Sequence, residues 1–219
     1  MLKVNNLAGF GVKTAEAVAL SSLSFVDDAT EDGGDAITAP ASIDAGDLLV
    51  MLDYHVKPDG GGLPAGWTQI LNLSGAYVEV TASYLIADGT EDGASITGWT
   101  GGLEGGKIIQ QFRGDSPASA VTVQDVGSQL TSGNPTAQTI TASGGTVPLI
   151  AFAGYGSSGA VSPRTFTPAE DGETSVSNPT IVELYLKYKI YNASPANISV
   201  DMDDEGFDNA LVSFYLEVS

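Results

Sequence analysis

The chain has 219 residues, enough for one domain with a substantial core but few for two domains of ordinary size. Its 8 lysines and arginines against 27 aspartates and glutamates give a formal charge of −19, which excludes the basic clusters that bind nucleic acid or an anionic membrane surface. The absence of cysteine and the single histidine exclude thiolate and multi-histidine metal sites, whereas 42% hydrophobic residues favour a folded domain over a disordered acidic chain.

The beginning of the chain is expected to form an extended arm over residues 1–18, ahead of a single β-sandwich domain over residues 19–219. Asparagines at positions 5 and 6 and a glycine at position 9 interrupt the apolar residues, so we expect no targeting segment there and no run that spans a bilayer. A helix over residues 14–20, capped by Thr14, is the single helical candidate. The alternative is that the extended arm continues through these residues.

Apolar residues alternate with polar ones along much of the chain, whereas the 3.6-residue period of an amphipathic helix is not sustained. Alternation of period two places every second side chain on one face, as in a half-buried strand. The last strand should lie inside its sheet. The longer predicted strands are 48–57, 76–87, 181–191 and 210–218, and the shorter ones are 19–26, 67–73, 107–112, 119–124, 138–142 and 147–153.

Glycine-rich turns join these strands, and the crossover helices that a parallel sheet needs are missing. The sequence therefore predicts an all-β fold, an antiparallel and jelly-roll-like β-sandwich with an extended N-terminal arm. Residues 156–179 contain three prolines and are expected to form a long irregular connection, either a flap over the sandwich or a contact arm.

Three acidic turns share a local sequence, TEDG at positions 30 and 90 and AEDG at position 169. Aspartate tolerates positive φ and glycine favours it, so this sequence suits a tight turn. The starting positions are separated by 60 and 79 residues. This irregular spacing argues against a solenoid or a propeller.

His55 shares a strand face with Asp53, a spacing that could orient a catalytic imidazole. The segment GSSGA at 156–160 fails as a nucleophile motif, because its second glycine comes one residue too early. Carboxylate pairs suited to a glycosidase arise by chance among 27 acidic residues, and the glycine-rich residues 98–102 lack the lysine of a phosphate-binding loop. We expect a surface or cross-strand histidine, no catalytic residue and no cofactor.

The run from Asp201 to Asp208 is the densest acidic segment. Its start matches a calcium loop, with acidic residues at alternate positions and a glycine at the sixth. Val212 stands at the twelfth position, where such a loop needs a bidentate glutamate. Two interpretations stay open, an acidic turn between strands and a calcium site of another geometry, and no metal ligand is assigned.

The aromatic residues Trp67, Trp99, Tyr77, Tyr84 and Tyr155 could form a platform on which sugars stack. Trp67 follows a Pro-Ala-Gly turn at the start of a strand, where we expect its ring to be buried at the end of the sandwich. Trp99 and Tyr155 are expected to lie exposed in loops. These two are the candidate contacts for a glycan or receptor.

The segment PASIDAGDLLV at 40–50, followed by LPAGWT at 63–68, resembles a recurrent segment of small structural proteins of tailed bacteriophages. In those proteins AGDLLV leads into a strand, and a PxGWT turn precedes a strand that ends in a run like YLIADGTE at 84–91. The resemblance covers about residues 1–100. From the residues alone, Pro64 and Gly66 are expected at the second and fourth positions of a type I turn.

The resemblance implies a non-enzymatic virion component, made in the host cytoplasm, that decorates the capsid or belongs to the tail. We expect a homo-oligomer, with a trimer favoured, attached to the major capsid protein or to tail proteins, and neither nucleic acid nor a membrane as partner. The alternative is a carbohydrate- or receptor-binding module of a tail. The docking element is expected to be the arm, whose apolar side chains need a partner to bury them: Leu2, Val4, Leu7 and Phe10.

Overall fold

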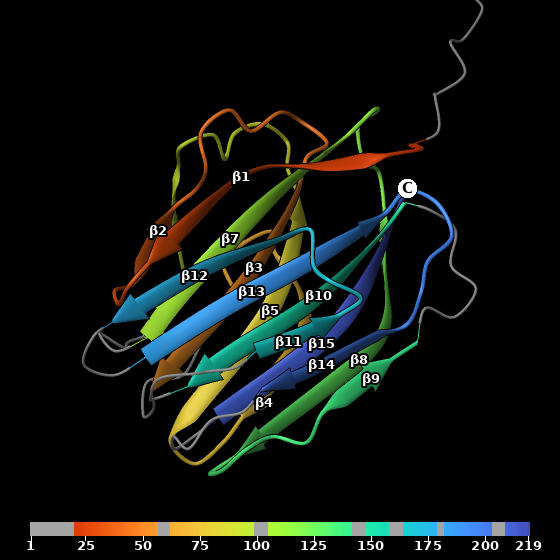
Figure 1. Cartoon of the computed structure of the whole chain (residues 1–219). Helices are drawn as coiled ribbons and strands as arrows, with labels where there is room; N and C mark the ends of the chain where they lie inside the picture. Colours follow the sequence, from red (N-terminus) through yellow and green to blue (C-terminus); the bar gives the residue numbers. More distant parts are fainter. Residues whose placement is uncertain are drawn as a thin grey trace, which may run out of the picture.

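The computed structural model describes residues 20–56, 62–98, 105–141, 148–157, 164–178, 182–202 and 209–219 (Figure 1). Within these ranges the chain forms β-strands and no helix, so none of the described segments is a helix that could cross a membrane. All strand pairs are antiparallel. The predicted all-β, antiparallel sandwich is confirmed, and its jelly-roll connection stays a prediction. The arm over residues 1–18 lies outside the described ranges.

Two five-stranded sheets form the centre of the molecule. The first sheet has the order β1-β7-β3-β5-β4, with β1 Leu23–Glu31, β7 Gly105–Gly114, β3 Leu48–Val56, β5 Val78–Ile86 and β4 Thr68–Ser74. The second has the order β12-β13-β10-β15-β8, with β12 Gly172–Asn178, β13 Val182–Tyr191, β10 Leu149–Ser157, β15 Asn209–Val218 and β8 Val121–Thr131.

Two small sheets cover the outer faces of these sheets. One pairs β2 (Ala36–Thr38) with β6 (Ser95–Thr97), and its side chains pack with outward-facing residues of β3 and β7. The other has the order β11-β14-β9, with β11 Arg164–Thr167, β14 Ile198–Met202 and β9 Gln138–Ile140, and it packs with outward-facing residues of β10 and β15. The described part of the chain therefore has four layers of sheet, which Figure 1 shows in part.

Three hydrophobic cores lie between these layers. The central core joins the two five-stranded sheets, and Phe112, Phe152 and Phe214 meet there, with the Phe152 and Phe214 ring centroids 5.0 Å apart. The outer cores lie beneath the small sheets. The middle strands are consequently buried on both faces. This explains why β10 and β15 have apolar residues at successive positions as well as alternate ones.

The long strands begin and end within a few residues of their predicted bounds, whereas several short ones were not predicted. The expectation of an irregular connection over residues 156–179 is wrong, because β11 and β12 lie in it. Of the described side chains of β12, an edge strand, Thr174 is buried and Val176 partly buried, so the sequence there shows little apolar alternation. The predicted helix over residues 14–20 falls outside the described residues except for Leu20, which is not helical.

The turn before β4 also differs from its prediction. The amide of Trp67 donates to the carbonyl of Pro64, with an N to O distance of 3.2 Å, so Pro64 is the first residue of the turn and Gly66 the third. Gly66 has a φ of 87°. Positive φ at the third position is typical of a type II turn and favours glycine there, so the type I assignment is wrong.

Three of the four edge strands of the large sheets carry a β-bulge. The pairing shifts at Val26 in β1, at Ile70 in β4 and at Asp125 in β8. Bulges twist an edge and interrupt its row of free backbone groups, which discourages pairing with another chain. The edges of this sandwich are therefore poorly suited to lateral strand addition.

Between the two large sheets, bulky residues of β3 face glycines of β10. A Cβ built on Gly154 would lie 2.6 Å from Cδ2 of Leu52, and one on Gly156 would overlap the ring of Tyr54. Both bulky residues are fully buried. The glycines thus provide the space into which the opposite sheet packs.

We expect Gly156→Ala to lower the free energy of unfolding by about 1–3 kcal/mol, because the added methyl group overpacks the core against Tyr54. Gly133→Ala is the matched control, since a Cβ there meets nothing within 4 Å. Urea denaturation of the two variants and the parent protein measures the effect. Equal stability of the two variants would contradict this packing.

Candidate functional site

A cluster of ionisable residues lies buried on the outer face of the first sheet. Asp53 and His55 project from β3, Asp53 pairs in register with Lys107 on β7, and His55 pairs with Glu79 on β5. All four residues are less than a tenth exposed. Burying charges costs free energy unless they are paired, so this cluster needs internal partners.

The contacts within the cluster supply these partners. Nδ1 of His55 lies 3.0 Å from Oδ2 of Asp53, and Nζ of Lys107 lies 3.7 Å from Oδ1 of the same carboxylate. The Lys107 ammonium also donates to the carbonyl of Gly34 at 2.6 Å, which ties the segment between β1 and β2 to the sheet. The Glu79 carboxylate accepts a hydrogen bond from the side chain of Asn72 at 2.7 Å.

The His55 ring is oriented through Nδ1, and Nε2 has no hydrogen-bond partner. A carboxylate that holds one imidazole nitrogen and leaves the other free is the arrangement of an oriented base. The two cavities described below lie elsewhere, and neither is lined by these residues. The geometry therefore favours a structural role, with His55 as a buried cross-strand residue rather than a surface one.

Replacing Lys107 should be far more damaging than replacing an exposed lysine. We expect Lys107→Met to lower the free energy of unfolding by about 3–5 kcal/mol, because it leaves the buried Asp53 carboxylate without its cation. Lys189→Met is the control. Its ion pair with Asp171 at 2.9 Å is partly exposed and should contribute at most about 1 kcal/mol. Thermal or urea unfolding measures both variants. Equal losses of unfolding free energy in the two would refute the role of Lys107 as the cation of Asp53.

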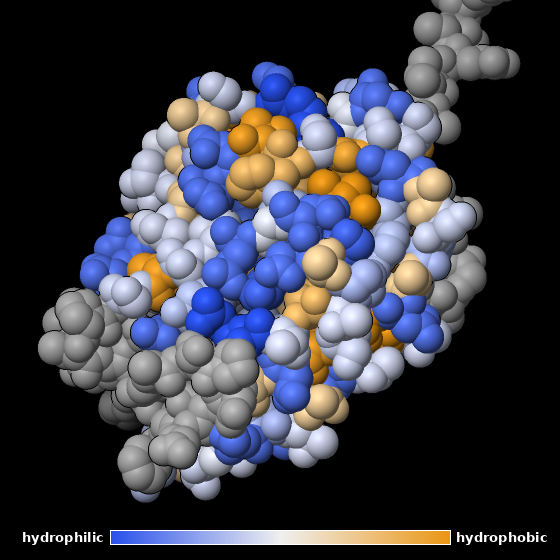
Figure 2. Space-filling view, viewed as in Figure 1, coloured by the Kyte–Doolittle hydropathy of each residue, from blue (hydrophilic) through white to orange (hydrophobic). Residues whose placement is uncertain are grey.

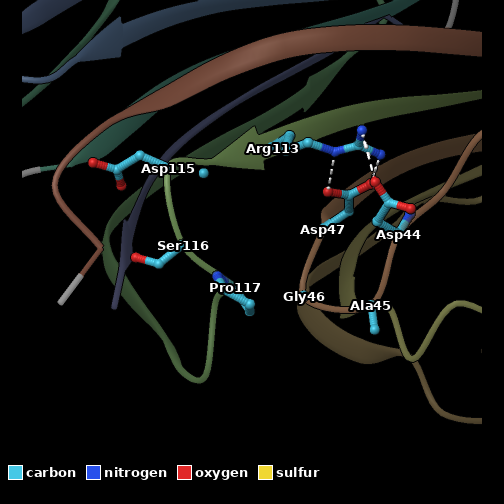
Figure 3. A pocket seen from close by; sticks show the side chains of 9 residues that line it. Asp44, Ala45, Gly46, Asp47, Arg113, Asp115, Ser116 and Pro117 are labelled. Carbon is cyan, nitrogen blue, oxygen red and sulfur yellow. Dashed lines mark hydrogen bonds and ion pairs between the residues drawn. The ribbon is translucent and has the colours of Figure 1, made fainter. Parts of the chain in front are cut away.

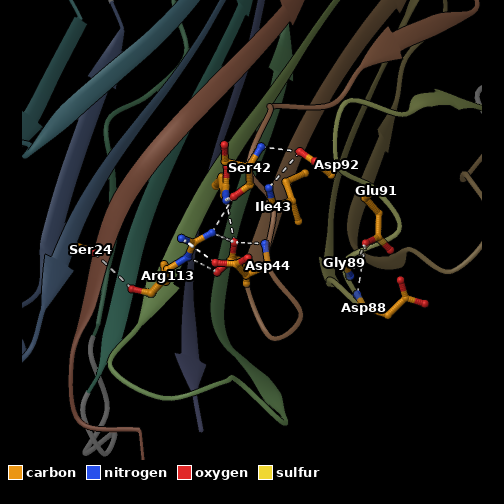
Figure 4. Close-up of polar contacts among 11 residues, drawn as sticks. Ser24, Ser42, Ile43, Asp44, Asp88, Gly89, Glu91, Asp92 and Arg113 are labelled. Atoms are coloured by element: carbon orange, nitrogen blue, oxygen red, sulfur yellow. Dashed lines mark hydrogen bonds and ion pairs between the residues drawn. The ribbon is translucent and has the colours of Figure 1, made fainter.

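A second polar cluster lines a cavity of about 190 Å³ at one end of the first sheet (Figure 3). Arg113, at the end of β7, donates from Nε to Oδ1 of Asp47 at 2.8 Å and from Nη2 to Oδ2 of Asp47 at 2.7 Å. Its Nη1 lies 2.8 Å from a carboxylate oxygen of Asp44, and its Nη2 also donates to the carbonyl of Ser42 (Figure 4). The guanidinium is thus bound on each of its nitrogens.

Asp47 is the buried member of this second cluster, with 2% of its surface exposed. It accepts hydrogen bonds from Gln111 at 2.7 Å and from the amide of Asp44 at 2.9 Å, besides those of Arg113. Burial by itself would raise the pKa of Asp47, but these hydrogen bonds and the guanidinium charge outweigh it and hold the pKa below its ordinary value. The carboxylate therefore stabilises the fold in its charged form.

The cavity wall also explains the glycine of the AGDLLV segment. Gly46 has a φ of 91°, and a Cβ there would overlap Pro117. The amide of Ala118 donates to the carbonyl of Gly46 at 3.0 Å. The segment that follows β7 thus packs directly on this glycine. The residues that line the cavity therefore hold this segment against the loop before β3.

Asp47→Asn should lower the free energy of unfolding at pH 7 by about 1.5–3 kcal/mol, because charge-assisted hydrogen bonds are lost. The folded pKa lies below the unfolded value of about 3.9, so the contribution is complete above that value and disappears as pH falls through the folded pKa. The difference from the parent should therefore shrink below about pH 4. Asp44→Asn, at a side chain 70% exposed, is the control and should cost at most about 1 kcal/mol.

The acidic turns use their carboxylates within the fold. Oε2 of Glu91 accepts from the amides of Asp88 and Gly89, and Oδ1 of Asp92 accepts from the amides of Ser42 and Ile43 (Figure 4). The amide of Ala94 donates to the carbonyl of Glu91 at 2.9 Å and Gly93 has a φ of 59°, which confirms that TEDG at position 90 is a turn sequence. The contacts of Asp92 also connect that turn to the loop before β3.

A groove of about 550 Å³ lies beside the same turn. Trp67, Leu85 and Ile96 form part of its wall, and Asp88 and Thr90 lie on its polar side. Trp67 is 7% exposed and belongs to the outer core under β2 and β6, so its predicted burial is confirmed.

Tyr155 does not lie in an exposed loop, and that prediction is wrong. The residue is in β10, fully buried, and its hydroxyl donates to the carbonyl of Thr165 at 2.8 Å. β10 continues further than predicted and has a small sheet over its outer face, which explains the burial. Burial also raises the pKa of Tyr155. Other predicted site residues lie outside the described residues, namely Leu2, Val4, Leu7, Phe10, Trp99 and residues 203–208 of the acidic run.

The basic side chains of the described residues all have acidic partners. Lys107, Arg113 and Lys189 are paired as given above, and Arg164 and Lys187 both contact Glu173, each at 3.4 Å. Sequence reasoning missed these pairs. The signal available was a set of polar residues on one face of β7, namely Lys107, Gln111 and Arg113, interrupted by Ile109.

Comparisons with protein-family models, with curated proteins and with solved structures found no match to this chain.

Proposed function

We propose that this chain is a non-enzymatic structural component of a tailed-bacteriophage virion, either a capsid-decorating protein or a tail accessory protein. The observation that carries the proposal is that the charged side chains of the described clusters and turns are bound within the fold. In the described residues the cations are paired with carboxylates, and the carboxylates of the clusters and turns accept hydrogen bonds within the fold. Such a molecule presents an acidic, stable surface.

The surface supports this proposal in two further ways. With the cations of the described residues paired and a formal charge of −19, the chain repels polyanions and resists non-specific aggregation. On the face shown in Figure 2, apolar residues occur in small groups separated by polar ones. The bulged edge strands also discourage strand addition. A repeated surface protein needs these properties, because it must stay soluble before it is assembled.

Attachment then falls to the arm, through Leu2, Val4, Leu7 and Phe10, with the major capsid protein or tail proteins as partners and a homotrimer as the favoured assembly. We expect the full chain to co-sediment with phage particles that lack it, and a chain without residues 1–18 to remain folded but stay in the supernatant. Changing the four apolar residues to serine keeps the length of the arm and should have the same effect. Particle binding by both altered chains would contradict the proposal.

A second candidate function, binding of a polysaccharide or receptor by a tail module, is favoured by the groove beside Trp67, with Asp88 and Thr90 on its polar side. Gold-labelled antibody against the chain separates the candidates in electron micrographs of particles. Label spread over the head supports a decorating protein. Label only at the tail tip supports the second candidate, and absence of label from particles contradicts both.

A further inference from the structure

We infer that the chain is an internal duplication, in which two copies of one seven-stranded unit pack face to face about a pseudo-twofold axis. The first copy runs from β1 to β7 and the second from β8 to β15, with residues 115–120 between them. The inference rests on strand order, on register and on reciprocal contacts. It does not depend on the proposed function.

The strand orders of the two halves are the same. In the first sheet the order is β1-β7-β3-β5-β4, and the second sheet, taken from its other edge, is β8-β15-β10-β13-β12. Each half thus places its first and last strands side by side, followed by its third strand, and its second strand pairs with its sixth in a small outer sheet, β2 with β6 and β9 with β14. β11 is the only additional strand among the described residues.

The register of the strands agrees as well. Adding 104 to each residue number of β7 (Gly105–Gly114) gives β15 (Asn209–Val218). The same shift of β5 (Val78–Ile86) gives 182–190, which is β13 less its last residue. A shift of 98 carries the start of β1 at Leu23 to the start of β8 at Val121. Both of these first strands have a bulge near their middle.

The outer sheets match in residue type and position. Ile37 of β2 pairs with Ile96 of β6, and Ile140 of β9 pairs with Ile198 of β14. All four isoleucines are buried, and each pair anchors its small sheet in the outer core beneath it. The same cross-strand pair therefore performs the same task in both halves.

The edge strands of the two halves make reciprocal contacts, as a twofold axis requires. β1 lies against β12, and the corresponding pair, β4 and β8, is also in contact. Away from the edges the contacts are closer on one side, where β7 lies against β12 and β13, than at the corresponding pairs of β15 with β4 and β5. Leu52 of β3 faces Gly154 of β10, and Tyr54 faces Gly156. Because both numbers rise together by two, β3 and β10 run in the same direction across the interface. The axis therefore runs along these two strands, in the plane between the sheets.

The two ends of the chain fit this arrangement. The amide of Ser21 donates to Oδ1 of Asp115 at 2.9 Å, and the amide of Ser219 donates to the carbonyl of Ala120 at 3.0 Å. The six-residue connection from β7 to β8 thus begins beside the start of β1 and ends beside the end of β15. The twofold axis relates this path to an equally long one from β15 to β1.

The inference is tested by exchanging the order of the halves. The exchanged chain has residues 1–22, 121–218, 115–120, 23–114 and 219 joined in that order, so its composition is that of the natural protein. In a control, a flexible glycine and serine segment of about 15 residues replaces residues 115–120 and imposes no geometry. Gel filtration, circular dichroism and urea denaturation compare both chains with the parent.

We expect the exchanged chain to be a folded protein of the parent's oligomeric state, with a cooperative unfolding transition and the same dependence on urea. Six residues then suffice to bridge β15 and β1, as the axis requires. A control that folds while the exchanged chain does not would overturn the inference, since the two paths would differ in length. Failure of both chains would also overturn the inference. Because each half pairs its own first and last strands, two equivalent halves should fold in either order.

Discussion

Burial of the middle strands on both faces is the constraint from which the rest of this structure follows. β3, β7, β10 and β15 have the central core on one side and an outer core on the other. A strand in this position must pair all its backbone groups with neighbours, because no water reaches them. It also needs a layer over its outer face. The small sheets of β2 with β6 and of β9, β14 and β11 provide those layers.

The same constraint determines where charge is placed. Polar residues that share an outer face with core residues cannot reach solvent, so they are stable only as pairs. Asp53 with Lys107 is such a pair, and the buried Asp47 is paired with Arg113, whose side chain is 36% exposed. Both cations also donate to a backbone carbonyl and so tie a loop to the sheet. The lysines and arginines of the described residues are all paired with carboxylates. Because the chain has 27 acidic residues and 8 basic ones, the charge left unpaired is acidic.

Sequence patterns predicted the elements whose signal is local. The long strands and the burial of Trp67 could be predicted because alternation and turn residues lie within a few positions of each other. Short covering strands such as β2 and β6, three residues each, have no period to detect. The bonds between Asp47 and Arg113 join positions 66 apart, and nothing in either neighbourhood indicates the other. Tyr155 was misplaced because its strand extends into a glycine-rich segment with the composition of a loop.

Comparison of the two halves distinguishes features that the fold requires from features that are present in one half alone. By the register of the halves, Asp53, His55 and Lys107 correspond to Tyr155, Ser157 and Leu211. In the second half the residues at these positions are also buried, but they form no charged cluster. These positions can therefore be buried either with a charged cluster, as in the first half, or without one, as in the second. In the first half the hydrogen bond from Lys107 to Gly34 also ties the segment before β2 to the sheet.

The halves also differ in the size of the side chains where they meet. Leu52 and Tyr54 occupy the space that Gly154 and Gly156 leave, so large side chains in one half face glycines in the other. Two copies of the first half would collide at these residues, and two copies of the second would leave a cavity. The halves have thus become complementary, and each is now a specific partner for the other within one chain.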